Sequence, residues 1–148
     1  WRAVFLGDGP LRGALEEELR RGGVESQCEF RGWVDGPDVQ TALDSSDVLV
    51  MPSLSEGLPV AAVEAAARGL AICGSAIPGL RDVLEDGVNG WSLPVDDAAA
   101  WREALVEAMR DRAGLRRRQE AALVLARKFE LGGILSAYEE VLGAACAG

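Results

Sequence analysis

The chain has 148 residues, of which 49% are apolar and 26% are charged, and it contains no histidine. This length and apolar content predict a single core and about one domain. With 15 basic and 24 acidic residues the formal net charge is -9, which argues against nucleic acid as a partner, because its backbone is also negative. No apolar run approaches the roughly 20 residues that span a bilayer, and the first residues do not resemble a signal peptide, so we expect a cytoplasmic location.

Signals for strands and helices alternate along the chain. In chain order, the predicted elements are a strand at Trp1–Gly7, a helix at Leu11–Arg21, a strand at Cys28–Arg31, a helix capped by Asp38 and running to about Ser46, a strand at Val48–Met51, a helix at Pro59–Arg68, a strand at Ala71–Gly74, a helix at Leu80–Glu85, a strand at Gly90–Leu93, and helices at Asp97–Asp111, Ala113–Phe129 and Leu131–Ala145. Repeated strand-helix units predict an α/β fold with a doubly wound parallel sheet. We find no linker or repeat, so residues 1–148 are predicted to form one domain.

The three cysteines, Cys28, Cys73 and Cys146, are odd in number and far apart. Without histidine and without the usual ligand spacing they do not form a zinc motif, so we interpret them as buried thiols. No pair of aspartates has a convincing metal-binding arrangement either, so we expect no metal and no cofactor.

The segment from Pro52 to Gly69, PSLSEGLPVAAVEAAARG, holds the most informative pattern. A strand is predicted to end just before it, and Pro59 can occupy the first position of the helix that follows. The free N–H groups at such a helix start carry the positive end of the helix dipole and attract phosphate or sugar oxygens. Two carboxylates, Glu56 and Glu64, flank this start with seven residues between them. Both could be purely structural, because glutamate favours helices and exposed loops.

Several runs of the chain resemble the family 4 retaining glycosyltransferases of the GT-B fold. The run SEGLPVAAVEAAARGLAICGS is similar to the signature of that family, and LGDGPLRGALEE is similar to its strand-to-helix turn. The runs FRGWVDGPDVQTALDSSDVLVMPS and IPGLRDVLEDGVNGWSLPVDD are similar to its later strands and Gly-rich loop. The order and spacing of these pieces carry the resemblance along nearly the whole chain, and they imply the Rossmann-like, carboxyl-terminal, donor-binding half of such an enzyme.

The resemblance implies roles for individual residues. The catalytic position that contacts the transferred sugar becomes Glu56, and the carboxylate that holds the ribose hydroxyls becomes Glu64. The donor sugar and phosphate contacts are implied at Gly57, Leu58, Pro59 and Val60, where Pro59 has no N–H to give. The implied nucleotide-binding residues are Gly7, Gly9, Trp33, Val34, Asp35 and Ser53. The glycines could instead form a simple helix-entry turn, and Trp33 could instead belong to the core.

The chain departs from the family pattern at two places. Where relatives often carry Gly-Gly followed by Glu, this chain has Pro78-Gly79 and then Asp82. The family's donor domain also begins with a further strand and a loop whose Arg and Lys neutralise the diphosphate, and neither is found here. We therefore expect a piece that is truncated at its amino end, lacks its first strand-helix unit and is inactive alone.

The predicted function is the donor-binding part of a metal-independent hexosyltransferase that uses a UDP, GDP or ADP sugar and a saccharide, lipid or small-molecule acceptor. The resemblance implies a preceding acceptor domain as partner, and it leaves peripheral membrane association of the whole enzyme open. A non-catalytic nucleotide-sugar-binding module is the alternative. A flavodoxin-type signalling domain and a GT-B isomerase fit the residues less well, because Lys128 is badly placed for the first and the glutamate pair is unexpected in the second.

Overall fold

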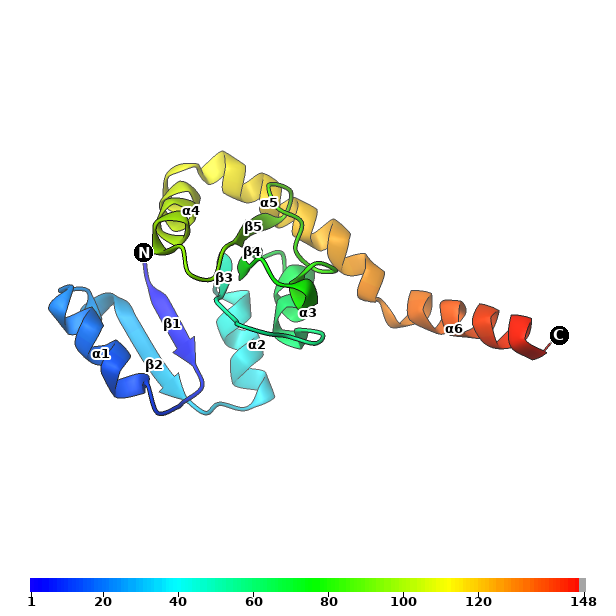
Figure 1. Ribbon diagram of the computed structural model, residues 1–148, viewed down its shortest axis with the longest axis horizontal. Coiled ribbons are helices and arrows are strands. Elements are labelled where there is room, and N and C mark those ends of the chain that lie inside the picture. The colour runs from blue at the N-terminus through cyan, green and yellow to red at the C-terminus, as the bar shows by residue number, and fades with distance from the viewer. Residues whose placement is uncertain (147–148) are drawn as a thin grey trace. The chain divides into compact units, whose positions relative to one another are not determined.

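The computed structural model describes residues 1–146, and its backbone falls into two compact units, Trp1–Ser45 and a second unit that begins at Ser46 (Figure 1). Each unit contains parallel strands that alternate with helices along the chain. The predicted α/β class is therefore confirmed.

The first unit is built on a two-stranded parallel sheet. Its elements are β1 (Ala3–Leu6), α1 (Arg12–Arg21), the 3₁₀ helix η1 (Glu25–Gln27), β2 (Cys28–Gly32) and α2 (Gly36–Asp44). Phe5 of β1 lies opposite Phe30 of β2, and the two rings stack with centroids 4.5 Å apart. Beyond the strands, the N–H of Gly7 donates to the carbonyl of Gly32 at 2.7 Å. The loops that follow β1 and β2 therefore leave the sheet side by side.

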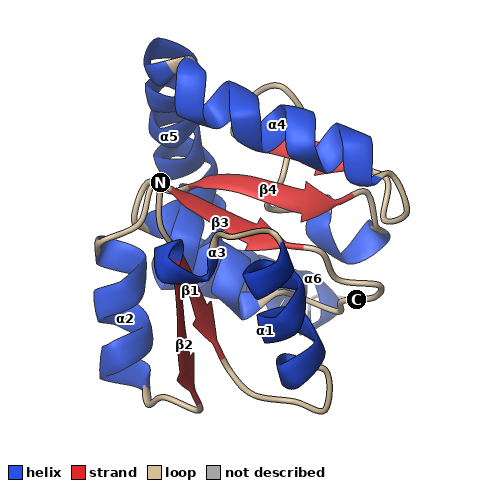
Figure 2. Cartoon of the chain, turned by 90° about the vertical axis from the view of Figure 1, so that its left-hand side faces the viewer, coloured by secondary structure: helices blue, strands red, loops and turns tan. Residues whose placement is uncertain are grey.

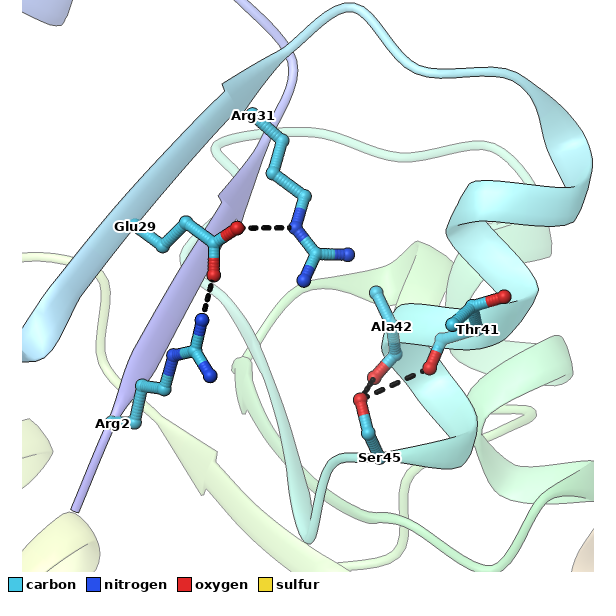
Figure 3. Close-up of polar contacts among 6 residues, drawn as sticks. All are labelled: Arg2, Glu29, Arg31, Thr41, Ala42 and Ser45. Atoms are coloured by element: carbon cyan, nitrogen blue, oxygen red, sulfur yellow. Dashed lines mark hydrogen bonds and ion pairs between the residues drawn. The ribbon is translucent and has the colours of Figure 1, made fainter.

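Charged side chains connect β2 with the residues around it (Figure 3). The carboxylate of Glu29 accepts hydrogen bonds from Arg2 and, at 2.8 Å, from Nε of Arg31. The bond from Arg31 is the main reason that the pKa of Glu29 lies below its ordinary value. These pairs are partly open to solvent, so we expect them to add little to stability.

Side-chain hydrogen bonds define both ends of α2. The carboxylate of Asp35 accepts from the N–H of Asp38 at 3.1 Å, so Asp35 caps the helix and the predicted cap at Asp38 is wrong. Proline favours the first turn of a helix, and the proline that precedes Asp38 already lies inside α2. At the other end, Ser45 Oγ donates to the carbonyls of Thr41 and Ala42 at 3.0 and 3.1 Å (Figure 3).

The second unit is built on a three-stranded parallel sheet in the order β3-β4-β5. Its strands are β3 (Val48–Met51), β4 (Ala71–Ser75) and β5 (Gly90–Leu93). Its helical elements are α3 (Val60–Ala67), η2 (Pro78–Leu80), α4 (Ala98–Arg110), α5 (Arg112–Ala126), η3 (Arg127–Phe129) and α6 (Leu131–Cys146). The predicted strands at Val48–Met51 and Gly90–Leu93 have these same bounds.

The central strand β4 is buried on both faces, as expected for a parallel strand covered by helices. Ile72 packs into one apolar cluster with residues of α3 and the second half of α5. Its neighbours Ala71 and Cys73 point to the other face and pack with α4 and the start of α5. Figure 2 shows α4 and α3 on opposite sides of β4. The predicted arrangement of helices on both faces is thus confirmed for this unit.

The predicted helix at Leu80–Glu85 is wrong. Only the short 3₁₀ turn η2 forms, which ends at Leu80, and residues 81–83 are turns. The buried side chain of Asn89 accepts from the N–H of Glu85 and donates to the carbonyl of Val83, both at 2.8 Å. These bonds satisfy backbone groups that a helix would otherwise pair, and Gly87 turns the chain with φ +73°.

The cysteines differ in exposure, and the described ones are free thiols. Cys73 is fully buried, as predicted, and Cys28 is half-buried. Cys146 lies exposed on α6, so its predicted burial is wrong. Within residues 1–146, no helix is both long enough and apolar enough to cross a membrane.

Candidate functional site

The junction between β3 and α3 lies at the carboxyl end of a parallel strand (Figure 1). β3 ends at Met51, residues 52–59 form an irregular loop, and α3 begins at Val60. In the neighbouring strand β4, Gly74 lies opposite Met51. The segments that follow β3 and β4 therefore leave from the same edge of the sheet, which is where open α/β sheets bind ligands.

Glu56 is held in place within the loop. Ser53 Oγ donates a hydrogen bond of 2.7 Å to Oε1 of Glu56, and both side chains are partly buried. The turn η2, through Gly79, lies directly against the backbone of Glu56. The predicted contact of Ser53 with a nucleotide stays a prediction, and the contact that the structure contains is with Glu56.

Pro59 precedes the helix and does not occupy its first position. Its φ of -78° and ψ of 90° are extended, and its carbonyl accepts from the N–H groups of Ala62 at 2.9 Å and Val63 at 3.2 Å. Among the described residues, no side chain caps α3. The N–H groups at Val60 and Ala61 have no acceptor inside the helix, so the positive end of the helix dipole faces the loop.

Glu64 lies in the second turn of α3, and its side chain is half-buried. The two residues that follow it, Ala65 and Ala66, are fully buried. Arg68 donates from Nη1 to the backbone carbonyl of Glu64 at 3.2 Å. An ionised carboxylate at this position can accept two hydrogen bonds from a pair of neighbouring hydroxyl groups.

In the first unit, hydrogen bonds of the Asp8 and Arg12 side chains hold the loop after β1. Gly7 has φ +109°, in the region that favours glycine. Asp8 accepts from the N–H of Gly9 at 2.8 Å and from Arg12 Nη1 at 3.1 Å. Arg12 also donates to Glu16 at 2.8 Å, and these bonds, led by that to Glu16, raise the pKa of Arg12 above its ordinary value. Two carboxylates thus already engage the guanidinium of Arg12.

The loop after β2 carries the other residues predicted to bind the nucleotide. Trp33 is 83% exposed, so the alternative that places it in the core is wrong. Val34 is half-buried, and Asp35 is used as the cap of α2. The bond between Gly7 and Gly32 places this loop beside the loop after β1.

A mostly apolar hollow of about 660 Å³ opens in the first unit beside the loop after β1. Besides Gly7 and Gly9, its lining includes Phe5, Leu11 and Phe30. The two phenylalanines were not among the predicted site residues. The parallel pairing of β1 with β2 could have indicated them, because it brings equivalent positions of the two strands together.

The predicted site residues are thus grouped within each unit. The first unit gathers Gly7, Gly9 and the loop at Trp33, and the second gathers Ser53, Glu56 and the start of α3. Glu64 lies farther along α3 than these. Across residues 1–146, no group of three or more His, Cys, Asp or Glu side chains could hold a metal ion.

Comparison with known proteins gives the family. A model described as "Glycosyl transferases group 1" matches residues 1–111. The 2-deoxystreptamine N-acetyl-D-glucosaminyltransferase of Streptomyces fradiae is 35% identical over 111 residues, which are 74% of this chain and 26% of that enzyme. The chain spans about a quarter of the length of the curated relatives it matches.

Solved structures share the fold. The chain matches HepE of Anabaena in complex with UDP-glucose with a TM-score of 0.83 and 21% identity, over 97% of this chain and 41% of that one. It also matches the carboxyl-terminal domain of the group 1 glycosyl transferase LpcC of Francisella tularensis, with a TM-score of 0.81 and 21% identity, over 88% of this chain and 71% of that one. The predicted GT-B type of fold is therefore confirmed.

Proposed function

Because the chain belongs to the glycosyl transferases group 1 family, we propose that it is the donor-binding part of a retaining, metal-independent glycosyltransferase that moves a hexose from a nucleoside-diphosphate sugar. The observation that carries this proposal is the β3-α3 junction, where the carboxylate of Glu56, fixed by Ser53, lies in the loop that leads to the uncapped start of α3. The UDP-glucose in the HepE complex supports the class of donor.

The chemistry of each group suits this role. The leaving nucleoside diphosphate carries negative charge, which backbone N–H groups and the helix dipole at Val60 and Ala61 stabilise without a metal. The carboxylate of Glu56 accepts hydrogen bonds from sugar hydroxyls, and that of Glu64 accepts from the two ribose hydroxyls. Interactions that strengthen as charge develops on the leaving group lower the barrier to transfer.

In the first unit we assign the nucleotide contacts to the backbone at Gly7 and Gly9 and to the loop Trp33–Asp35. The glycines allow close approach of a ligand to the backbone, and the exposed face of Trp33 is free to stack on a base. Backbone contacts of this kind do not select among UDP, GDP and ADP.

The proposal is tested with the longest natural protein that contains this chain. Calorimetric titration with UDP, GDP and ADP identifies the nucleotide, and the corresponding sugar donors are then assayed for transfer after treatment with EDTA. We expect one nucleotide to bind and its sugar to be transferred with retention at the anomeric carbon, read by proton NMR. Nucleotide binding without transfer would favour the non-catalytic module, an inverted product would contradict the retaining mechanism, and loss of transfer in EDTA would contradict metal independence.

A further inference from the structure

Gly79, in the turn η2 that follows β4, approaches the backbone of Glu56 more closely than any other residue type could. A methyl group built on Gly79 would lie 2.1 Å from the carbonyl oxygen of Glu56, 2.6 Å from its carbonyl carbon and 2.9 Å from its Cβ. Gly79 is not among the glycines with positive φ, so the space beside it, and not its backbone conformation, requires glycine.

The contact at Gly79 is with backbone, as is that of Gly90 with the carbonyl of Ile72, and it differs in kind from the tight contact at Gly74. At Gly74 an added methyl group would meet Cδ2 of Leu84 at 2.9 Å and Cδ1 of Leu80 at 3.1 Å, which are the ends of flexible side chains. At Gly79 the atoms in the way belong mainly to the backbone of Glu56, which cannot rotate aside. A side chain at position 79 must therefore displace one of the two segments.

The turn η2 is the more firmly held segment. Leu80 is 1% exposed and packs in the apolar cluster with α3 and α5. The N–H of Leu80 donates to the carbonyl of Ile77 at 3.2 Å, and the N–H of Leu84 donates to the carbonyl of Leu80 at 2.8 Å. Pro78 further restricts the turn. The loop of Glu56 is irregular and has exposed side chains, so a clash at Gly79 moves Glu56.

We propose that Gly79 is a positioning residue for Glu56: with no side chain, it lets the rigid turn η2 support the backbone of Glu56, while Ser53 fixes the carboxylate, so that Glu56 is held ready for the transferred sugar. This inference rests on the proposed function.

The test is Gly79→Ala in the longest natural protein that contains this chain. A displacement of Glu56 by about 1 Å is expected to lower kcat for sugar transfer by roughly 10- to 100-fold, because misplacement on that scale weakens catalysis strongly. The Kd for the nucleoside diphosphate should stay within about twofold, because Glu56 is assigned to the sugar and not to the nucleotide. Equal losses of kcat and nucleotide affinity, or an unchanged kcat, would overturn the proposal.

Gly114→Ala is the matched control. It places the same methyl group in the same unit, against the side chain of Asp111 that caps α5, and away from both η2 and Glu56. We expect it to lower the Tm while kcat stays within about twofold of the parent. A fall in kcat as large as that of Gly79→Ala, at equal Tm, would mean that general strain and not positioning controls activity.

A second measurement tests the geometry without any assay of transfer. In the 148-residue chain, NMR should detect nuclear Overhauser contacts between the Gly79 Hα protons and the side chain of Glu56. In Gly79→Ala, the amide signals of residues 53–57 should shift while the two methyl signals of Val83 in the core do not. If transfer is absent from the parent protein, the proposed function fails, and the NMR result still decides whether Gly79 supports Glu56.

If Gly79→Ala is recovered only unfolded, Pro78→Gly decides the question. This change keeps the close contact at Gly79 and loosens the turn that provides it. We expect kcat to fall by a few-fold, roughly 3- to 10-fold, with little change in nucleotide affinity. An unchanged kcat in Pro78→Gly would contradict the proposal.

Discussion

Glu64 is a carboxylate on a helix whose neighbouring positions are buried alanines, and its proposed partner is the ribose. A charge-assisted hydrogen bond is worth about 1.5 to 3 kcal/mol, so we expect Glu64→Ala to weaken nucleotide binding by about 10- to 100-fold. Calorimetric titration of the longest natural protein with its nucleoside diphosphate measures this. The matched control is Glu103→Ala, which removes an exposed glutamate from α4. Unchanged affinity in Glu64→Ala would contradict the ribose assignment.

Glu56 should affect turnover, whereas Glu64 should affect nucleotide affinity. Glu56→Gln keeps the size of the side chain and removes the charge that we propose faces the transferred sugar. We expect kcat to fall by about 100-fold, as for the loss of other preorganised groups at a reacting centre, with the nucleotide Kd nearly unchanged. Steady-state kinetics and calorimetry on the same preparation separate the two. A parallel loss of nucleotide affinity would instead place Glu56 at the nucleotide.

Cys73 makes stability depend on pH in the alkaline range. Burial raises the pKa of its thiol from 9.0 to about 11. As the pH rises, the unfolded chain loses this proton before the folded chain does. The contribution of the thiol to the free energy of unfolding is therefore complete below about pH 9 and is lost between about pH 9 and 11, at about 1.4 kcal/mol for each pH unit. Urea unfolding of the parent and of Cys73→Ala from pH 8 to 11 measures it. Identical pH slopes in the two proteins would show that Cys73 does not contribute.

At the scale of elements, Glu107 of α4 connects α4 with β5 and α5. Its carboxylate accepts from Nε1 of Trp91 at 2.9 Å and from Nη2 of Arg118 at 2.8 Å, and the guanidinium of Arg118 lies 4.4 Å from the centre of the Trp91 ring. Glu107→Ala leaves both donors without this acceptor, so we expect a loss of about 1 to 3 kcal/mol in the free energy of unfolding. Urea denaturation measures it, with Glu103→Ala on the same helix as control. A loss no larger than that of the control would mean that water replaces the carboxylate.

The alternation of strands and helices could be predicted because each parallel strand is a short apolar run followed by turn residues and an amphipathic segment. The helix at Leu80–Glu85 could not be excluded in this way, because the residue that prevents it, Asn89, acts from beyond the segment through its side chain. The cap at Asp35 could not be told from one at Asp38 by residue type, because aspartate is a good capping residue at either position.

For the candidate site, the sequence predicted the junction and the positions of Glu56 and Glu64, because both are fixed by one local strand-loop-helix unit. It could not predict the contact between Gly79 and Glu56. That contact depends on how closely the segments after β3 and β4 approach each other, and this distance is set by core packing around Leu80. The sequence pattern indicates only that the two segments leave from the same edge of the sheet, and it does not indicate which of their atoms are in contact.

At the scale of the whole molecule, the described residues form two units, and the residues predicted for the nucleotide lie mostly in the first while those for the sugar and phosphate lie in the second. The core of the second unit is made by the sheet with α3, α4, α5 and the turns after β4. α6 has no part in either apolar cluster, and none of its residues is buried.

This distribution predicts that α6 can be removed without loss of the core. Its exposed apolar side chains include Leu131, Leu135, Tyr138, Val141 and Leu142. A chain that stops at Glu130 keeps Phe129, which packs on the core, so we expect its Tm to stay within about 2 °C of the full chain. Because exposed apolar faces promote association, the full chain should self-associate with rising concentration more than the shortened one. Calorimetry and sedimentation velocity measure the two effects. A fall in Tm of more than about 5 °C would mean that α6 stabilises the second unit through contacts beyond its apolar clusters. Equal self-association of both chains would mean that the surface through which they associate is not on α6.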